Sequence, residues 1–163
     1  MSERVENIMQ NYSQMVLERN CLKNQIQNFI GITADEMIET MVFYNGEGER
    51  IQTSNISNKT AHIAVAYEER MNRANREWLR HLEKKYSILA EEINFFEAAI
   101  KSLSSNLSDV IWDMVIERFT WDELESKHHI SRMTISRYRK KALQELNKLY
   151  ILHDAELAEF ILS

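Results

Sequence analysis

Proline is absent from the chain and glycine occurs only three times in 163 residues. Sandwiches, barrels and doubly wound sheets need these residues at their many turns, so their scarcity predicts the all-α class. It also excludes a glycine-rich loop that could cradle phosphates. We therefore expect an N-terminal helical hairpin, a long central helix and a C-terminal helix-turn-helix.

Cysteine is nearly absent as well, and no apolar run is long enough to act as a secretory leader or a membrane span. The single Cys21 cannot form a disulfide within the chain, which indicates a reducing compartment. We expect a cytoplasmic protein that does not associate with membranes. Its net charge of −5 argues against a protein that coats nucleic acid indiscriminately.

Two short helices joined by a tight turn are predicted within residues 120–146. Thr120 and Glu123 fit a capping box that starts a helix at Trp121, and Ser131 is a second N-cap. Seven residues fall where two crossed helices must meet, and this spacing is typical of a helix-turn-helix. They are Leu124, His128, Ile130, Ile135, Tyr138, Ala142 and Leu143.

The outward face of the second predicted helix is cationic. Residues 131–148 contain six lysines and arginines against Glu145 alone, a local charge of +5 that leaves −10 for the rest of the chain. Such a split favours one oriented surface for DNA, with the acidic remainder repelling misplaced phosphate.

The predicted DNA contacts divide into two sets. Arg137 is the main candidate for bidentate recognition of guanine, because its fork matches the O6 and N7 edge. The base-contacting set is Arg132, Met133, Thr134, Ser136 and Arg137. The phosphate-contacting set, which would fix the register, is Thr120, Lys127, Ser131, Arg139, Lys140 and Lys141.

This stretch resembles the last domain of bacterial sigma factors, which reads the upstream promoter element. The residues that carry the resemblance are Thr120, Asp122-Glu123-Leu124, Ile130-Ser131-Arg132, Ile135, Lys141-Ala142-Leu143 and Leu146. In a short chain with the motif near its C-terminal end, the closer resemblance is to phage transcription regulators of the ArpU and RinA kind. It implies control of late phage genes. Glu125 and His129 depart from the pattern, which usually has a small residue at the helix crossing and glycine in the turn. Glu125 must therefore either lean out to solvent or widen the crossing. His129 must adopt a strained turn conformation, which costs a residue with a Cβ about 1 kcal/mol.

The N-terminal segment shows a heptad seam over residues 5–29, with Arg19 at its one polar position. The seam either docks onto the rest of the chain or mediates self-association. Gly31 is the expected helix end, and Thr33 with Glu36 would open a short second helix through Phe43. A β-hairpin at the Asn45-Gly46 turn is the alternative for this region. The seam residues are Val5, Ile8, Tyr12, Met15, Leu22, Ile26 and Phe29.

A polar linker over residues 53–60 precedes the longest helical pattern, residues 61–103. At about 1.5 Å per residue this helix would be roughly 60 Å long. We therefore expect either a break near Lys84-Lys85 or cover by a second chain, and favour a homodimer. A support helix should start at Ser108, and the apolar tail should pack on the core or a partner. The expected segments are 1–55, 60–104, 105–150 and a tail helix over 151–163.

Enzyme chemistry finds little support. Glu125 and His128 have the spacing of carboxylate-bridged metal sites, but such sites need a second copy of the motif, which the chain lacks. Trp112 and Trp121 could stack on bases, although helix-crossing positions suit them better. We expect no catalytic residue, metal or cofactor.

The leading hypothesis is a dimeric, sequence-specific regulator of transcription that binds double-stranded DNA. One alternative is a DNA-recognising packaging or assembly subunit of a phage, in which the N-terminal helices build a ring. Another is an adaptor that contacts RNA polymerase. Stoichiometry distinguishes the first two, because a regulator should be a dimer on a palindrome and a packaging subunit a closed ring.

Overall fold

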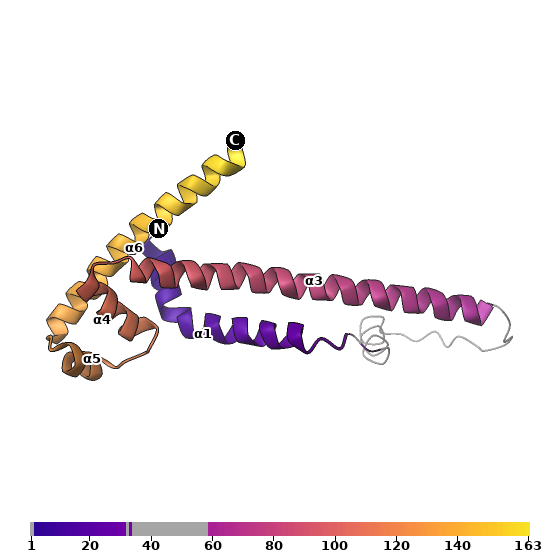
Figure 1. Cartoon of the computed structure of the whole chain (residues 1–163), viewed down its shortest axis with the longest axis horizontal. Helices are drawn as coiled ribbons and strands as arrows, with labels where there is room; N and C mark the ends of the chain where they lie inside the picture. Colours follow the sequence, from indigo (N-terminus) through magenta and orange to yellow (C-terminus); the bar gives the residue numbers. More distant parts are fainter. Residues whose placement is uncertain (1, 32, 34–58) are drawn as a thin grey trace, which may run out of the picture. The chain divides into compact units, whose positions relative to one another are not determined.

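The computed structural model describes residues 2–31, 33 and 59–163, and in this part of the chain every regular element is a helix. The helices are α1 (Ser2–Gln27), α3 (Lys59–Lys101), α4 (Ser105–Val115), α5 (Trp121–His128) and α6 (Arg132–Leu162) (Figure 1). The all-α prediction is confirmed. The capping box at Thr33 and Glu36, the turn at Asn45-Gly46 and most of the linker lie outside the described residues.

Packing divides the chain into two compact units. One combines Met1–Asn20 with Ile88–Ser163, and the other is Cys21–Ser87. The first unit therefore contains the start of α1, the end of α3 and all of α4, α5 and α6. This grouping joins the beginning of the sequence to its end.

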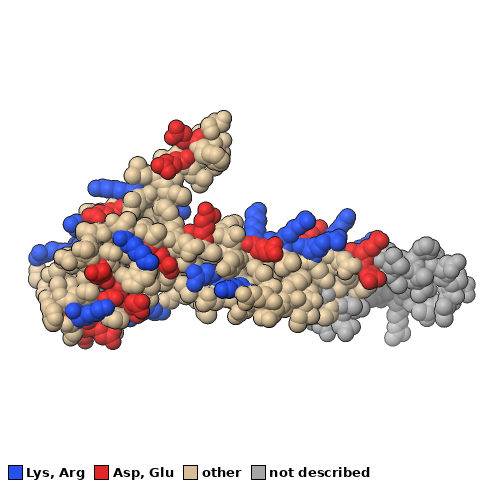
Figure 2. All heavy atoms as spheres, viewed as in Figure 1, with Lys and Arg blue, Asp and Glu red and all other residues tan. Residues whose placement is uncertain are grey.

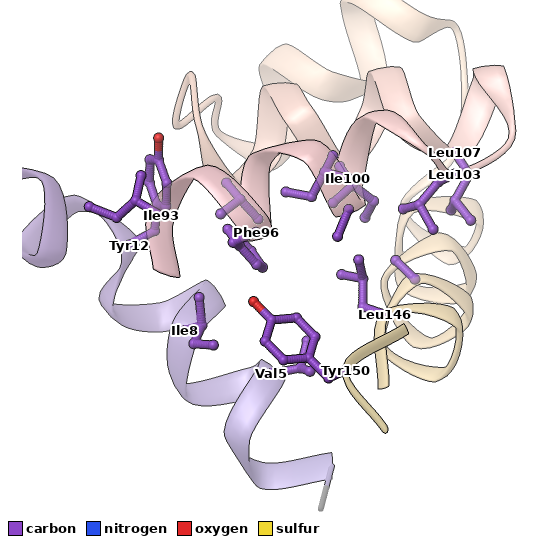
Figure 3. Packing of buried hydrophobic residues seen from close by; sticks show 14 residues of the cluster. Val5, Ile8, Tyr12, Ile93, Phe96, Ile100, Leu103, Leu107, Leu146 and Tyr150 are labelled. Carbon is purple, nitrogen blue, oxygen red and sulfur yellow. The ribbon is translucent and has the colours of Figure 1, made fainter. Parts of the chain in front are cut away.

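The core of the first unit forms where α1, α3 and α6 meet (Figure 3). Val5, Ile8 and Tyr12 are buried because their three- and four-residue spacing places them on one face of α1. They pack in one cluster with residues of α3 and α6, and each large side chain contributes about 1.5–3 kcal/mol by its burial. The first part of the heptad seam thus docks onto its own chain. The partners include Ile93, Phe96, Ile100, Leu146 and Tyr150.

Tyr12 adds a polar contact to this apolar face. Its hydroxyl donates a hydrogen bond to Oε1 of Glu97 on α3, and its ring lies 5.8 Å from that of Phe96 between centroids. Burial first, and the Glu97 carboxylate second, raise the pKa of Tyr12 well above its ordinary value. The phenol is therefore neutral at physiological pH and can act as a donor in this bond.

Helix α3 runs without interruption from Lys59 to Lys101, so the expected break near Lys84-Lys85 does not occur. No proline interrupts it, and its apolar stripe keeps helical spacing past the two lysines. On this stripe Leu82, Ile93, Phe96 and Ile100 are buried. Trp78, expected on the same stripe, is 44% exposed.

Within the second unit, Gly31 has the left-handed backbone expected of it, with φ +89°. A Cβ at this position would lie 2.9 Å from Nδ2 of Asn75 on α3, which also favours glycine. However, α1 ends at Gln27, four residues earlier than the cap position predicted.

Helices α4, α5 and α6 pack pairwise against one another. Helix α4 begins at Ser105 after an N-cap at Ser104, three residues before the start expected at Ser108. It ends at Val115, so Phe119 lies in the connection to α5 and not in the support helix. The buried face of α4 supports the α5 and α6 pair, as the sequence predicted. Its apolar residues are Leu107, Val110, Ile111 and Val115.

Candidate nucleic-acid interface

The N-termini of α5 and α6 are each fixed by local hydrogen bonds. Oγ1 of Thr120 accepts a bond of 3.2 Å from the Glu123 amide, and Glu123 Oε2 accepts one of 3.0 Å from the Thr120 amide. Oγ of Ser131 accepts a bond of 3.3 Å from the Thr134 amide at the start of α6. Both predicted caps are thus confirmed, and they fix where the two helices begin.

His129 occupies the turn in the left-handed conformation, with φ 53° and ψ 45°. A residue with a Cβ is disfavoured there by about 1–2 kcal/mol, which is why glycine is usual at such a position. The predicted strain at His129 is therefore present. The sharp reversal that it permits brings α6 back across α5.

The predicted crossing residues do face inward. Leu124, Ile135 and Ala142 have no exposed surface, and Tyr138 and Leu143 are half-buried against the core. His128 and Ile130 are also half-buried. With these positions inward, the helical period sends the side chains between them toward solvent.

The residues predicted to contact bases lie mostly on that outward surface. Arg132 and Arg137 are exposed, and Met133 is 69% exposed. Thr134 and Ser136 are half-buried. Figure 2 shows lysine and arginine side chains along the first part of α6, whereas the charged side chains on its final turns are all acidic.

Three of the cations predicted to contact DNA make no ion pair with a described residue. Arg137, Lys140 and Lys141 are exposed and pair with no carboxylate among the residues that the structure describes. Their charges are directed at solvent, so a polyanion can reach them without displacing a protein group. We define Arg137, Lys140 and Lys141 as the free basic face of α6.

Arg132 is held by acidic residues of α5. Its Nη2 lies 2.5 Å from Oδ1 of Asp122, and its Nε lies 3.7 Å from Oε1 of Glu125. These carboxylates, Asp122 above all, raise the pKa of Arg132. Glu125, the larger residue at the helix crossing, therefore leans outward, where its side chain is 34% exposed.

Arg139 and Lys127, both predicted phosphate contacts, also have partners within the protein. Nη2 of Arg139 lies 3.1 Å from Oε1 of Glu6 on α1. Nζ of Lys127 lies 2.8 Å from Oδ2 of Asp113 and 4.9 Å from the centroid of the Phe119 ring. Both cations are therefore partly neutralised by the protein itself.

Asp113 is a residue of this site that the sequence did not reveal. It is buried on α4, and its Oδ2 lies 2.7 Å from Nε2 of His128 as well as against Lys127. A buried carboxylate with two partners ties the end of α5 to α4. The apolar neighbours of Asp113 in the sequence are the only local sign of its burial, because its partners Lys127 and His128 both lie on another helix.

No metal centre forms in the described part of the chain, where no three histidine, cysteine, aspartate or glutamate side chains converge. Glu125 faces Arg132 and His128 faces Asp113, so the two residues of the metal-like spacing are directed to different partners. Trp112 packs against the core, with Nζ of Lys101 at 4.8 Å from its ring centroid. Trp121, expected at a helix crossing, is 38% exposed.

Comparisons with known proteins give no relative: no family model, curated protein or solved structure matches this chain. Among the described residues, no helix combines the length and apolarity that crossing a bilayer would need.

Proposed function

We propose that this chain is a sequence-specific, DNA-binding regulator of transcription that acts on phage or prophage genes. The observation that carries the proposal is the free basic face of α6. It lies on the second helix of a tightly capped pair, whose other face is anchored in a core. The phage assignment rests on the resemblance to the ArpU and RinA kind.

In the proposed mechanism, the first turns of α6 enter the major groove. That groove is about 12 Å wide, which matches the diameter of a helix with its side chains. Arg137 then reads a guanine through paired hydrogen bonds, while Lys140 and Lys141 hold phosphates one turn further along. The caps at Thr120 and Ser131 and the anchor at Asp113 keep the helix pair rigid, so little ordering is needed on binding.

Arg132 and Arg139 enter this mechanism differently from the free basic face. Each would exchange a carboxylate of the protein for a group of the DNA, so the gain from the new contact is offset by the loss of the old one. Substitution of Arg132 or Arg139 should therefore weaken DNA binding less than substitution of Arg137.

The test is selection of bound sequences from fragmented phage and bacterial DNA, followed by affinity measurements on the enriched site. Arg137→Ala should cost about 1–3 kcal/mol and relax the preference at one base pair. Lys140→Ala should weaken all sequences alike and reduce the salt slope by about one. Lys85→Ala, an equal change of charge on α3, is the control and should leave binding unchanged.

Two results would refute the proposal. One is that no sequence is enriched. The other is that Arg137→Ala binds with the affinity and preference of the unchanged protein. A closed ring of many subunits with weak sequence preference would instead favour the packaging alternative.

A further inference from the structure

The last three turns of α6 are apolar but uncovered. No residue from 151 to 163 is buried, and the segment contains no lysine or arginine. A helix with apolar residues on several faces is normally enclosed by other helices. Its large exposed side chains are Ile151, Leu152, Leu157, Phe160, Ile161 and Leu162.

An apolar groove lies at the base of this segment. One wall comes from the end of α3, with Phe95, Ala98, Ala99 and Ser102. The other comes from α6, with Leu149, Leu152, His153 and Glu156. The groove has a volume of about 330 Å³. A cavity of roughly 150 Å³ already accommodates a benzene molecule, so this groove is large enough for an aromatic ring.

The groove and the exposed segment share one face of α6. Leu149, His153, Glu156 and Phe160 follow one another at steps of four, three and four residues, which is the spacing of a coiled-coil seam. The first three of these residues line the groove. Leu152 and Leu157 flank the seam on its two sides.

This seam is complementary to itself in one register. If two copies of α6 cross antiparallel about a two-fold axis between residues 154 and 155, Leu149 of each copy meets Phe160 of the other. His153 then meets Glu156 of the other copy, which pairs a base with an acid twice. His153 is held in position by its own chain, since its ring lies tilted against that of Phe95 with 4.4 Å between centroids.

We propose that a second copy of this chain docks here, with its Phe160 in the groove and the two α6 ends antiparallel. The self-matching order of the four seam residues favours a copy of the chain over an unrelated helix. Asp154 does not oppose this pairing, because it lies off the seam and is held by Arg4 at 3.0 Å. The proposal does not depend on DNA binding.

The expected dimer is weak. Twelve residues of helix span only about 18 Å, too short for a coiled coil to form without support. The wall from α3 supplies the additional apolar surface. We therefore expect dissociation at low micromolar concentrations, a range typical of a small interface.

A charge swap tests the register in the full chain by sedimentation equilibrium. His153→Glu alone places four carboxylates at the interface, and Glu156→Lys alone places lysines against histidines. Each single change should weaken dimerisation about tenfold. The combined His153→Glu and Glu156→Lys chain restores opposite charges and should recover the dimer. Failure of the combined chain to recover it would overturn the proposed register.

Phe160 provides a second test, because it is 78% exposed and its substitution should leave the fold intact. Phe160→Glu should weaken dimerisation at least about tenfold without changing the circular dichroism spectrum. In a Cys21→Ser background and with oxygen as the oxidant, a chain with Leu149→Cys should form a disulfide with a second chain carrying Phe160→Cys. Neither variant alone should form a disulfide-linked dimer.

The proposal is overturned if the protein is a monomer at high micromolar concentration. It is likewise overturned if Phe160→Glu dimerises as well as the unchanged chain, or if the mixed disulfide does not form. Because none of these measurements includes DNA, their failure leaves the proposed function standing. Conversely, loss of DNA binding in Arg137→Ala says nothing against the dimer.

Discussion

The two halves of α6 form one continuous helix but have opposite environments. In the first half, Ile135, Ala142, Leu146 and Tyr150 are buried at intervals of seven, four and four residues. In the second half, beyond Tyr150, every residue is exposed. The apolar content does not fall at this point. The two halves differ because α1, α3, α4 and α5 cover the first half and reach no further than the start of the second.

Helical structure and burial therefore have separate causes in α6. No proline or glycine lies between residues 132 and 162, so nothing in the local sequence stops the helix at Tyr150. Burial, in contrast, depends on which helices are close enough to cover a face. The tail helix expected over residues 151–163 is accordingly a continuation of α6.

The largest expected difference between the halves is in the cost of removing a leucine. Leu146→Ala should lower the free energy of unfolding by roughly 2–5 kcal/mol, because Leu146 is fully buried. Leu152→Ala, at a position that is 63% exposed, should change it by no more than about 0.5 kcal/mol. Urea unfolding at low protein concentration measures both. Equal losses would contradict the contrast between the two halves.

The boundary between the halves can be located by pH. Burial, with a smaller effect of Glu92, raises the pKa of Tyr150 to about 12. In the unfolded chain the phenol of Tyr150 ionises near pH 10. The contribution of Tyr150 to the free energy of unfolding is therefore complete below about pH 10. It is lost as the pH rises toward 12, because the unfolded state gives up its proton first. We expect a loss of stability over this range that is smaller in Tyr150→Phe.

Absorbance of tyrosinate provides the direct measurement for Tyr150. Subtracting the titration of Tyr150→Phe from that of the unchanged chain isolates this one phenol. A difference curve centred near pH 10 would show that Tyr150 is solvated, and would move the boundary of the core toward the first half of α6.

The two ends of α6 should also respond differently to loss of a serine. Ser131→Ala removes the N-cap beside the anchored half and should cost about 1 kcal/mol. Ser163 Oγ donates a bond of 2.8 Å to the Phe160 carbonyl at the free end. Ser163→Ala should have little effect, because a free terminal turn frays. Thermal unfolding compares them, and equal costs would mean that the far end is also anchored.

A small effect is also expected at the ion pair that the second half makes with α1. Arg4 and Asp154 are both half exposed, so their pair at 3.0 Å should contribute no more than about 1 kcal/mol. Asp154→Asn should show this small loss at low salt, and less at high salt because of screening. Asp109→Asn, on an exposed residue without an ion pair to any described residue, is the control. A loss of more than about 1 kcal/mol in Asp154→Asn would indicate that α1 holds the second half of α6 firmly.

Local features of the candidate site could be predicted from the sequence. The capping box at Thr120, the cap at Ser131 and the strained turn at His129 depend on residues within four positions of each other. The crossing residues Leu124 and Ile135 follow from helical period alone. All of these predictions are confirmed.

Contacts between distant segments could not be predicted in the same way. Asp113 with His128, and Arg139 with Glu6, join residues on different helices, and nothing near Glu6 in the sequence marks it as the partner of an arginine in α6. The sequence does not decide whether α3 continues past Lys84-Lys85, for a related reason. A helical pattern predicts that a helix forms, but the support available to it depends on other parts of the chain.

The union of α1 with the end of the chain has a consequence for synthesis on the ribosome. Arg4 and Asp154 are 150 residues apart, so α1 leaves the ribosome long before α6 exists. At roughly 5–20 residues per second, the interval is on the order of 10 s. During that time the apolar face of Val5, Ile8 and Tyr12 lacks its α6 partners and is open to chaperones. A transcript cut short before codon 146 would yield a chain that cannot complete this core, and we expect such fragments to be degraded.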